Sequence, residues 1–397
     1  MRVSTAAQHA SAYQAISKRY EALLKTQNQV ASGQRIQTPA DDPSGAVRAL
    51  DLDRTLAESQ QFGRNADMVR NRLSLEEQTL SDATSVIDRI RTLTVQANTS
   101  TMDVESRKSI TVEMQARMRE LVDIANRKDS NGEYLFAGLS TLVQPFSQSG
   151  NAVAYAGDQG VRNVQTSPTE HVIDGHSGFD VFMDVTNGNG TFVASAAAGN
   201  RGTGVVGANS VTDPAAWVAD TYTVHFTSPT AYEVLDGSSN QVTTGTYTSP
   251  GTIAFNGVQI EITGAPQTDD AFTIAPSGKQ DMFTTVANLL STMNRATTTQ
   301  ADQAQFFTEM GSALVHIDRA LDHLGSVRAE VGARLSVLDQ TDDTRADTEL
   351  SLEGSISELR DLDYAAAITQ LNLQSVGLQA AQASYARLGQ ISLFDYL

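Results

Sequence analysis

Residues 364–386 read YAAAITQLNLQSVGLQAAQASYA and contain no Asp, Glu, Lys or Arg. Residues 3–17 lack all four as well. A helix on a protein surface normally carries charge on the face that meets water, so an uncharged helix is usually surrounded by protein or lipid. Both stretches are rich in Gln, Asn, Ser and Thr, whose polar groups would lack partners in lipid. The two ends of the chain are therefore predicted to be helices that bury their surfaces against protein in an assembly.

Apolar side chains recur every seven residues in three stretches, residues 8–32, 69–97 and 307–359. Alternating spacings of three and four predict helices that pack along a seam, and the last stretch lacks proline and predicts one long helix. Residues 38–43 read TPADDP and separate the first two stretches. Carboxylates followed by a proline are typical of a helix start, so a second helix is expected from about residue 43.

The middle of the chain has a different composition. From about residue 141 to residue 280, the residues Gly, Thr, Asn and Val become more frequent. Alternating runs such as 222–226 and 258–262 replace the helical period there. Such runs between turn residues are typical of β-hairpins, and a short strand is also expected at 133–137. The chain is therefore predicted to be an α+β multidomain protein. Helices from both chain ends form an antiparallel coiled-coil rod, and a β-rich domain is inserted at its tip.

These changes of pattern predict three domains. The apolar area on the terminal seams is small beside the cost of ordering a backbone, about 1–2 kcal/mol per residue. We therefore expect the terminal segments to be disordered in the monomer and to form an inner core on assembly. The heptad side chains of 44–130 and 285–350 are expected to form ordinary intramolecular core. The expected domains are the terminal helices 1–42 with 355–397, a helical rod domain 43–140 with 281–354, and the β-rich inserted domain 141–280.

Composition excludes several classes of function. The formal net charge of −18 disfavours nucleic acid as a partner, because an acidic chain repels phosphate. The absence of Cys excludes disulfides, thiolate catalysis and Cys-ligated zinc. Residues 1–16 lack the apolar core of a secretory signal peptide, and no apolar run is long enough to predict a membrane helix. Neither a cofactor nor membrane insertion is expected.

Four motifs suggest chemistry, but each has a simpler explanation. Residues 202–207, GTGVVG, match a dinucleotide fingerprint without its strand and helix, so a loop is expected. His316 and His323 lie about 10 Å apart along a helix, too far to share a metal, and are expected to be solvated. Residues 184–190 lack the spacing of a calcium loop, and the adjacent acids 269–270 point to opposite faces of a strand. No catalytic residue and no metal site are expected, so the chain is predicted not to be an enzyme.

Several longer motifs resemble the flagellin family of bacterial flagellar proteins. Residues 27–46 read QNQVASGQRIQTPADDPSGA and are similar to the N-terminal signature of that family. The prolines that flank the acids, NGEYLFAG at 131–138, DLDYAAAI at 361–368 and SLFDYL at 392–397 resemble the branch that joins the hook to the filament. The resemblance covers roughly residues 1–140 and 280–397.

This resemblance implies a structural role. Proteins of this branch form a short junction zone between the first hook-associated protein and the filament, by pairing of their N- and C-terminal helices. The implied partners are further copies of the chain in a ring-like assembly, flagellar hook-associated protein 1, flagellin, and an export chaperone on the C-terminal helix. The implied location is the extracellular flagellum, reached by flagellar type III secretion without a cleaved signal peptide. The residues expected at the assembly interface are Tyr13, Ile16, Tyr20, Leu23, Val30, Leu371, Leu378, Tyr385, Leu388, Leu393 and Phe394.

Two alternatives stay open at this point. Flagellin itself would have the same terminal helices and would form the whole filament. A secreted β-domain adhesin or polysaccharide hydrolase with coiled-coil stalks would instead carry a ligand pocket within 141–280.

Overall fold

The computed structural model describes residues 5–99 and 102–390, which form long helices on both sides of antiparallel strands. This confirms the predicted fold class of N- and C-terminal helical regions with a central antiparallel β-rich domain. The chain folds as two compact units, which we call the terminal unit (Met1–Arg64 with Gln340–Leu397) and the central unit (Asn65–Asp339). The helices are α1 (Thr5–Ser32), α2 (Pro43–Ala97), α3 (Val104–Ala125), α4 (Met282–Met293), α5 (Gln300–Arg360) and α6 (Tyr364–Gln390).

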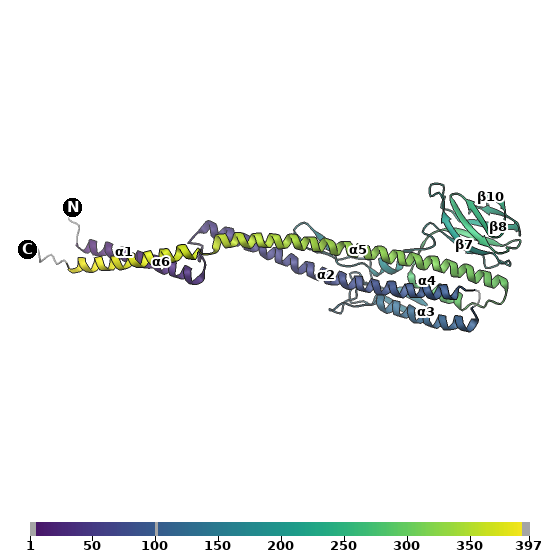
Figure 1. Cartoon of the computed structure of the whole chain (residues 1–397), viewed down its shortest axis with the longest axis horizontal. Helices are drawn as coiled ribbons and strands as arrows, with labels where there is room; N and C mark the ends of the chain where they lie inside the picture. The colour runs from purple at the N-terminus through teal and green to yellow at the C-terminus, as the bar shows by residue number, and fades with distance from the viewer. Residues whose placement is uncertain (1–4, 100–101, 391–397) are drawn as a thin grey trace, which may run out of the picture. The chain divides into compact units, whose positions relative to one another are not determined.

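The terminal unit consists of paired helices. Within the terminal unit, α1 and α6 lie side by side (Figure 1). The start of α2 lies against the end of α5, where Ser59 donates to Glu349 at 2.8 Å. As predicted, α2 begins at Pro43, and the Asp42 carboxylate just before it accepts the Gly45 N–H at 2.9 Å, which caps the helix.

The central unit has a continuous core between α2, α3, α4 and α5. The predicted seven-residue seams supply this core, because a repeat of three and four keeps one face of each helix turned inward. Seam residues that are at most 1% exposed are Leu73, Leu80 and Ile87 on α2 and Met310, Ile317 and Leu324 on α5.

The outer parts of the β-rich region pack onto these helices. Phe182 lies with its ring centroid 5.2 Å from Phe136 and 5.5 Å from Phe146, within the helical core. Three small antiparallel pairs and one turn of π-helix, η1 (Phe179–Met183), make up this layer. The pairs are β1 (Phe146–Ser149) with β2 (Ala152–Tyr155), β3 (Asn163–Gln165) with β4 (His171–Ile173), and β5 (Val185–Thr186) with β14 (Lys279–Gln280).

The remaining strands form a β-sandwich with a core of its own (Figure 1). Side chains alternate between buried and partly buried along β8 and β12, and the buried faces of both sheets meet. One antiparallel sheet has the order β10-β9-β8-β13-β6 and the other the order β11-β12-β7. The strands are β6 (Phe192–Ala196), β7 (Val205–Val211), β8 (Tyr222–Ser228), β9 (Ala231–Leu235), β10 (Gln241–Thr246), β11 (Gly251–Phe255), β12 (Val258–Thr263) and β13 (Ala271–Pro276).

The strand predicted at 133–137 is absent. Tyr134 forms one isolated antiparallel bridge with Lys128, and the residues after it turn into the helical core. Leu135, Phe136 and Ala137 are all buried, so this run does not alternate between two faces as a strand does. A short apolar run gives no period that separates a strand from a buried turn, and the prediction was wrong here.

The expectation of ordinary core over 44–130 and 285–350 holds only from Ala66 to Leu338. Outside those limits it is wrong, because Val47 is 61% exposed, Leu50 66% and Leu350 70%. Two paired helices cannot cover more than one face of each other, so seam and flank positions there stay open to solvent.

Candidate assembly interface

The predicted interface residues of the terminal helices divide into two sets. Within the α1–α6 pair, Leu378 is 8% exposed, and Tyr385 lies edge-on to His9 with ring centroids 5.6 Å apart. The first set is buried or half-buried in the single chain and consists of Ile16, Leu23, Val30, Leu371, Leu378 and Tyr385.

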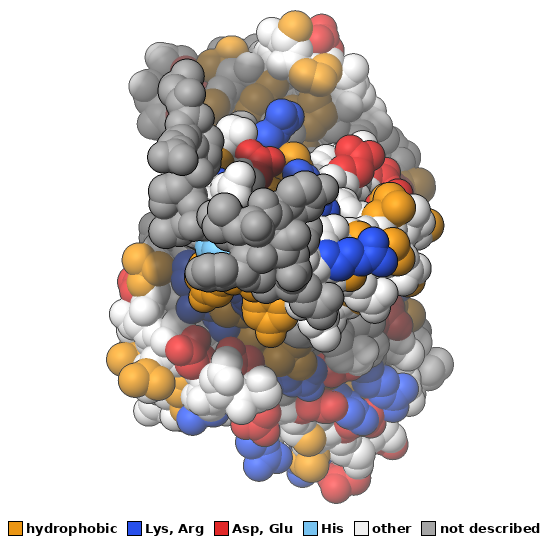
Figure 2. Space-filling model, turned by 90° about the vertical axis from the view of Figure 1, so that its left-hand side faces the viewer, with side chains coloured by type: hydrophobic (Ala, Val, Ile, Leu, Met, Phe, Trp, Pro, Cys, Tyr) orange, Lys and Arg blue, Asp and Glu red, His pale blue; other side chains and the backbone are white. Residues whose placement is uncertain are grey.

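The second set is exposed in the single chain. Tyr13 is 68% and Tyr20 51% exposed, although both belong to the seven-residue repeat. Figure 2 shows hydrophobic side chains open to solvent among charged ones on one face of the molecule. Leu388, Leu393 and Phe394, also predicted at the interface, lie outside the residues whose side chains the structure describes. Further large apolar side chains exposed in the terminal unit are Leu24, Val47, Leu50, Leu350, Tyr364, Ile368, Leu373 and Val376.

Backbone hydrogen bonds join the two places where the helices are interrupted. The Arg35 N–H donates to the Arg360 carbonyl at 2.7 Å, and the Leu362 N–H donates to the Gly33 carbonyl at 2.9 Å. Gly33 has a φ of +72°, and a Cβ there would come 2.8 Å from the Tyr364 hydroxyl. The signature residues 27–46 thus fix the turn from α1 to α2 against the turn from α5 to α6.

The two acids of the signature have different roles. Asp41 forms an ion pair with Lys25 at 2.6 Å and accepts the Thr38 N–H at 2.9 Å. These two contacts hold the pKa of Asp41 well below its usual range. The Gly45 N–H and the Ser44 hydroxyl lower the pKa of Asp42 in the same direction. Both acids therefore stay ionised at neutral pH, Asp41 in the turn and Asp42 as the cap that the sequence predicted.

The motifs that suggested chemistry have structural roles. Residues 202–204 form the expected loop, but residues 205–207 already belong to strand β7, so the expectation of a loop was wrong for the second half of this motif, which no helix follows. Asp270 is 2% exposed and accepts the N–H groups of Arg201, Gly202 and Gln267, whereas the Asp269 side chain is 86% exposed. Residues 184–190 contain the predicted turn, in which Asn189 accepts the N–H groups of the next strand.

The expectation that His316 is solvated was wrong. Its side chain is half-buried, burial lowers its pKa, and its Nε2 atom has no hydrogen-bond partner among the described residues. The β-sandwich folds back onto α5 at this point, which the sequence of one helix cannot reveal. The His323 Nε2–H donates to the Asp180 carbonyl at 2.7 Å, so the two histidines have separate surroundings.

A charged site in the central unit was missed by sequence reasoning. Glu76 is 1% exposed and accepts both the backbone N–H of His176, at 3.2 Å, and its ring Nδ1, at 2.7 Å. The other ring nitrogen lies 3.2 Å from Glu330 on α5. Burial acts to lower the pKa of His176, but Glu76 outweighs it and holds the pKa above the ordinary value. The one available signal was Glu76 itself, a charge at a seam position.

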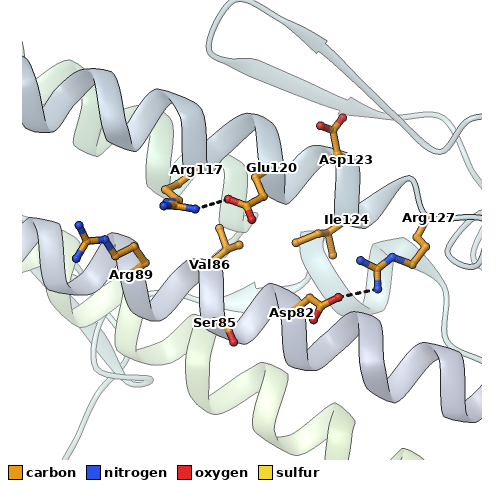
Figure 3. Close-up of a pocket in the computed structure, with 9 residues that line it drawn as sticks. All are labelled: Asp82, Ser85, Val86, Arg89, Arg117, Glu120, Asp123, Ile124 and Arg127. Atoms are coloured by element: carbon orange, nitrogen blue, oxygen red, sulfur yellow. Dashed lines mark hydrogen bonds and ion pairs between the residues drawn. The ribbon is translucent and has the colours of Figure 1, made fainter.

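A groove runs between α2 and α3 (Figure 3). Its volume is about 530 Å³, and Val86 and Ile124 line it between charged side chains. Asp82 pairs with Arg127 at 2.7 Å and Arg117 with Glu120 at 2.7 Å, as the dashed lines in Figure 3 mark. These two ion pairs neutralise four of the charged side chains of the groove, and Arg89 pairs with Glu113 at 2.8 Å, which suits a contact surface better than a catalytic site.

Among the described residues, no cluster of acids and histidines could hold a metal ion. The described helices also include none that is long and apolar enough to cross a membrane. The exposed apolar side chains of the terminal unit are the feature that points to a function, because such surfaces are usually covered by other proteins.

Comparison with known proteins defines the class first. Residues 3–141 match the family model of the bacterial flagellin N-terminal helical region, and residues 314–397 match that of the C-terminal helical region. Residues 195–276, within the β-sandwich, match the D2-like domain of flagellar hook-associated protein 1. The chain thus has the paired terminal regions of a flagellar axial protein.

Individual relatives narrow this class. The chain is 23% identical to flagellar hook-associated protein 3 of Escherichia coli over 395 residues, covering 100% of this chain and 99% of that protein. It is similar to the crystal structure of FlgL from Xanthomonas campestris, with 36% identity, a TM-score of 0.72, and coverage of 77% and 99% of the two chains. The flagellar junction protein FlgL of Legionella pneumophila is 30% identical, with a TM-score of 0.73 and coverage of 79% and 100%. The chain belongs to the flagellar hook-associated protein 3 family, and its role is structural, at the hook–filament junction.

Proposed function

We propose that the chain builds the junction through its terminal unit, between the first hook-associated protein and the filament. The observation that carries this proposal is the exposed apolar surface around Tyr13, Tyr20 and Leu373, on helices that lack charge over residues 5–17 and 364–386. Large apolar patches with this exposure mark surfaces that other proteins cover. Copies of the chain would bury these side chains against one another in a ring-like assembly.

The three predicted domains would have separate structural roles. Residues 1–42 with 355–397 are disordered in the monomer and form the inner core on assembly, with the interface residues named above. Residues 43–140 with 281–354 form the helical rod, and residues 141–280 form the β-rich domain. In support, the α1–α6 pair encloses few apolar side chains, whereas the helical and β-sandwich cores are large.

The partners follow from this role. The first hook-associated protein and flagellin contact the chain on either side, and an export chaperone covers the C-terminal helix α6 before assembly. The chain reaches the outside of the cell through flagellar type III secretion without a cleaved signal peptide. It is not an enzyme and uses no cofactor, since the charged groups described above are engaged with one another or with the backbone.

Immunogold electron microscopy of intact flagella tests this proposal, with an antibody raised against residues 150–275. We expect a narrow labelled band between hook and filament. Label along the whole filament would identify the chain as a flagellin instead. Absence of label on flagella would contradict the assembly role and favour an adhesin or hydrolase, which glycan binding by the same domain would then reveal.

A further inference from the structure

One face of α5 in the terminal unit is exposed in the described part of the chain. It holds Asp343, Asp347, Leu350, Gly354 and Glu358, which fall within an arc of about 80° at 3.6 residues per turn. Leu350 is 70% exposed, and a Cβ added at Gly354 would meet no atom within 4 Å. We call this surface the acidic face of α5.

The carboxylates on the acidic face have no partner in the described part of the chain. The side chains of Asp343, Asp347 and Glu358 are exposed, and among the described residues they make no hydrogen bond or ion pair. Asp343 and Asp347 lie one turn apart, where like charges repel. Both arginines of this stretch turn to other acids, Arg345 to Asp342 at 2.6 Å and Arg360 to Asp53 at 3.4 Å.

The α1–α6 pair has the opposite charge. Helices Thr5–Ser32 and Tyr364–Gln390 contain four basic residues and one acid, a formal net charge of +3, whereas residues 340–363 contain eight acids and two arginines, −6. Lys18, Arg19 and Arg387 are exposed and form no ion pair within the described part of the chain. The basic pair also presents Tyr13 and Tyr20, which are large exposed apolar side chains like Leu350.

These two surfaces cannot meet within one chain. Arg19 lies against Gly377 of α6, where a Cβ would come 2.6 Å from its guanidinium. Gly377 lies 13 residues beyond the start of α6 at Tyr364, which is about 20 Å of helix away from the end of α5, and exposed charges are screened beyond about 8 Å. Figure 1 shows α6 continuing onward from the end of α5 rather than folding back on it. The complementary surface must come from another molecule.

We propose that the acidic face of α5 binds the basic α1–α6 pair of a second copy of the chain. The inference rests on the proposed function, because only an assembled chain has such a neighbour. Charge complementarity sets the register of the contact, Leu350 packs against the aromatic stripe of α1, and Gly354 admits close approach of a helix.

Cross-linking tests this contact, because the chain has no Cys and its five lysines are Lys18, Lys25, Lys108, Lys128 and Lys279. The full chain with Leu350→Cys is assembled in cells, and isolated flagella are treated with a maleimide–succinimide cross-linker. We expect dimers in which residue 350 is linked to Lys18 or Lys25. The matched control is Thr348→Cys, an exposed position that lies about 160° around the same helix from residue 350. It should give at least about fivefold less of this product, since it lies off the face.

Charge reversal provides the second measurement, with the same cross-link as the readout. Asp343→Arg with Asp347→Arg, which adds no amine for the cross-linker, should lower the dimer yield about tenfold, and adding Arg19→Glu with Arg387→Glu should restore it. Links to Lys108, Lys128 or Lys279, or equal yields from both cysteine positions, would overturn the contact and leave the junction role intact. If Leu350→Cys fails to incorporate, Asp347→Cys replaces it. Absence of the wild-type chain from isolated flagella would refute the contact together with the proposed function.

Discussion

The terminal and central units differ in what their apolar side chains contact. In the described part of the terminal unit the buried apolar side chains are Ile36, Ala49, Ile356, Ala367 and Leu378, two of which are alanines. Both continuous cores lie within the central unit, where residues such as Phe182 and Leu324 are fully buried. The same seven-residue pattern thus gives an internal core in one unit and an open surface in the other.

This difference shows that the number of packed helices, and not the pattern alone, determines whether the apolar residues of a seam are buried. In the central unit α3, α4 and the β-rich layer cover the faces that α2 and α5 leave open. In the terminal unit each helix has one partner, so Tyr13 and Tyr20 stay at the surface. The central unit should therefore be stable alone, and the terminal unit should depend on neighbouring copies.

The largest effect is expected from Leu378→Asp, which places a charge inside the α1–α6 pair. Burying an unpaired carboxylate is costly, so this substitution should abolish incorporation into flagella. The urea midpoint of the central unit should not change, because Leu378 lies outside its core. Electron microscopy of flagella and urea unfolding followed by circular dichroism measure the two outcomes. Normal motility of cells with this variant would refute the burial of this seam, and Leu378→Met, which keeps the position apolar, is the control.

Limited proteolysis of the monomer should separate the two units by rate. Trypsin should cut after Lys18, Arg19 and Lys25 at least about 100-fold faster than at the buried Arg72, because opening of the terminal unit costs little free energy. Mass spectrometry over a time course identifies the fragments. Equal protection of the two sets of sites would mean that the α1–α6 pair is ordered in the free chain and would contradict the expected disorder.

Phe182→Ala should weaken the central unit alone. The ring is fully buried against Phe136, Phe146 and Phe283, and its removal should lower the free energy of unfolding by about 3–5 kcal/mol. Urea unfolding monitored by circular dichroism measures the loss. Leu142→Ala, at a side chain that is 81% exposed, is the control and should change it by less than about 0.5 kcal/mol. Equal effects of the two substitutions would contradict the central role of this aromatic cluster.

The sequence predicted the features whose signals are local. The start of α2 at Pro43 and the length of α5 followed from caps and an unbroken repeat, because neighbouring residues determine them. Local alternation likewise predicted β8 and β12. The burial of each seam position was not predictable, since it depends on how many elements pack against the helix.

Features that join distant residues had no local signal. The contact between His176 and Glu76 links residues 100 positions apart, and that between His176 and Glu330 links residues 154 apart. Among the predicted interface residues, Leu378 is buried and Tyr13 is exposed. This difference depends on the helix that packs alongside, so the local sequence could not predict it. Whether these side chains meet other copies remains a prediction that only the assembled flagellum can test.

The smallest effect is expected at His176, and it depends on pH. The ring holds Glu76 of α2 and Glu330 of α5 at once, so it contributes most to stability while it is protonated. Its pKa is raised in the folded state, so this stabilisation is complete below the ordinary pKa of about 6.5 and is lost as pH rises through the folded pKa. His176→Gln should therefore lower the free energy of unfolding of the central unit by about 1–3 kcal/mol at pH 5.5 and by less at pH 9. Urea unfolding at both pH values measures this, with His171→Gln, at an exposed side chain of β4, as the control. A loss that is equal at both pH values would show that the histidine acts through packing alone, and the central unit would then have no titrating link between its two long helices.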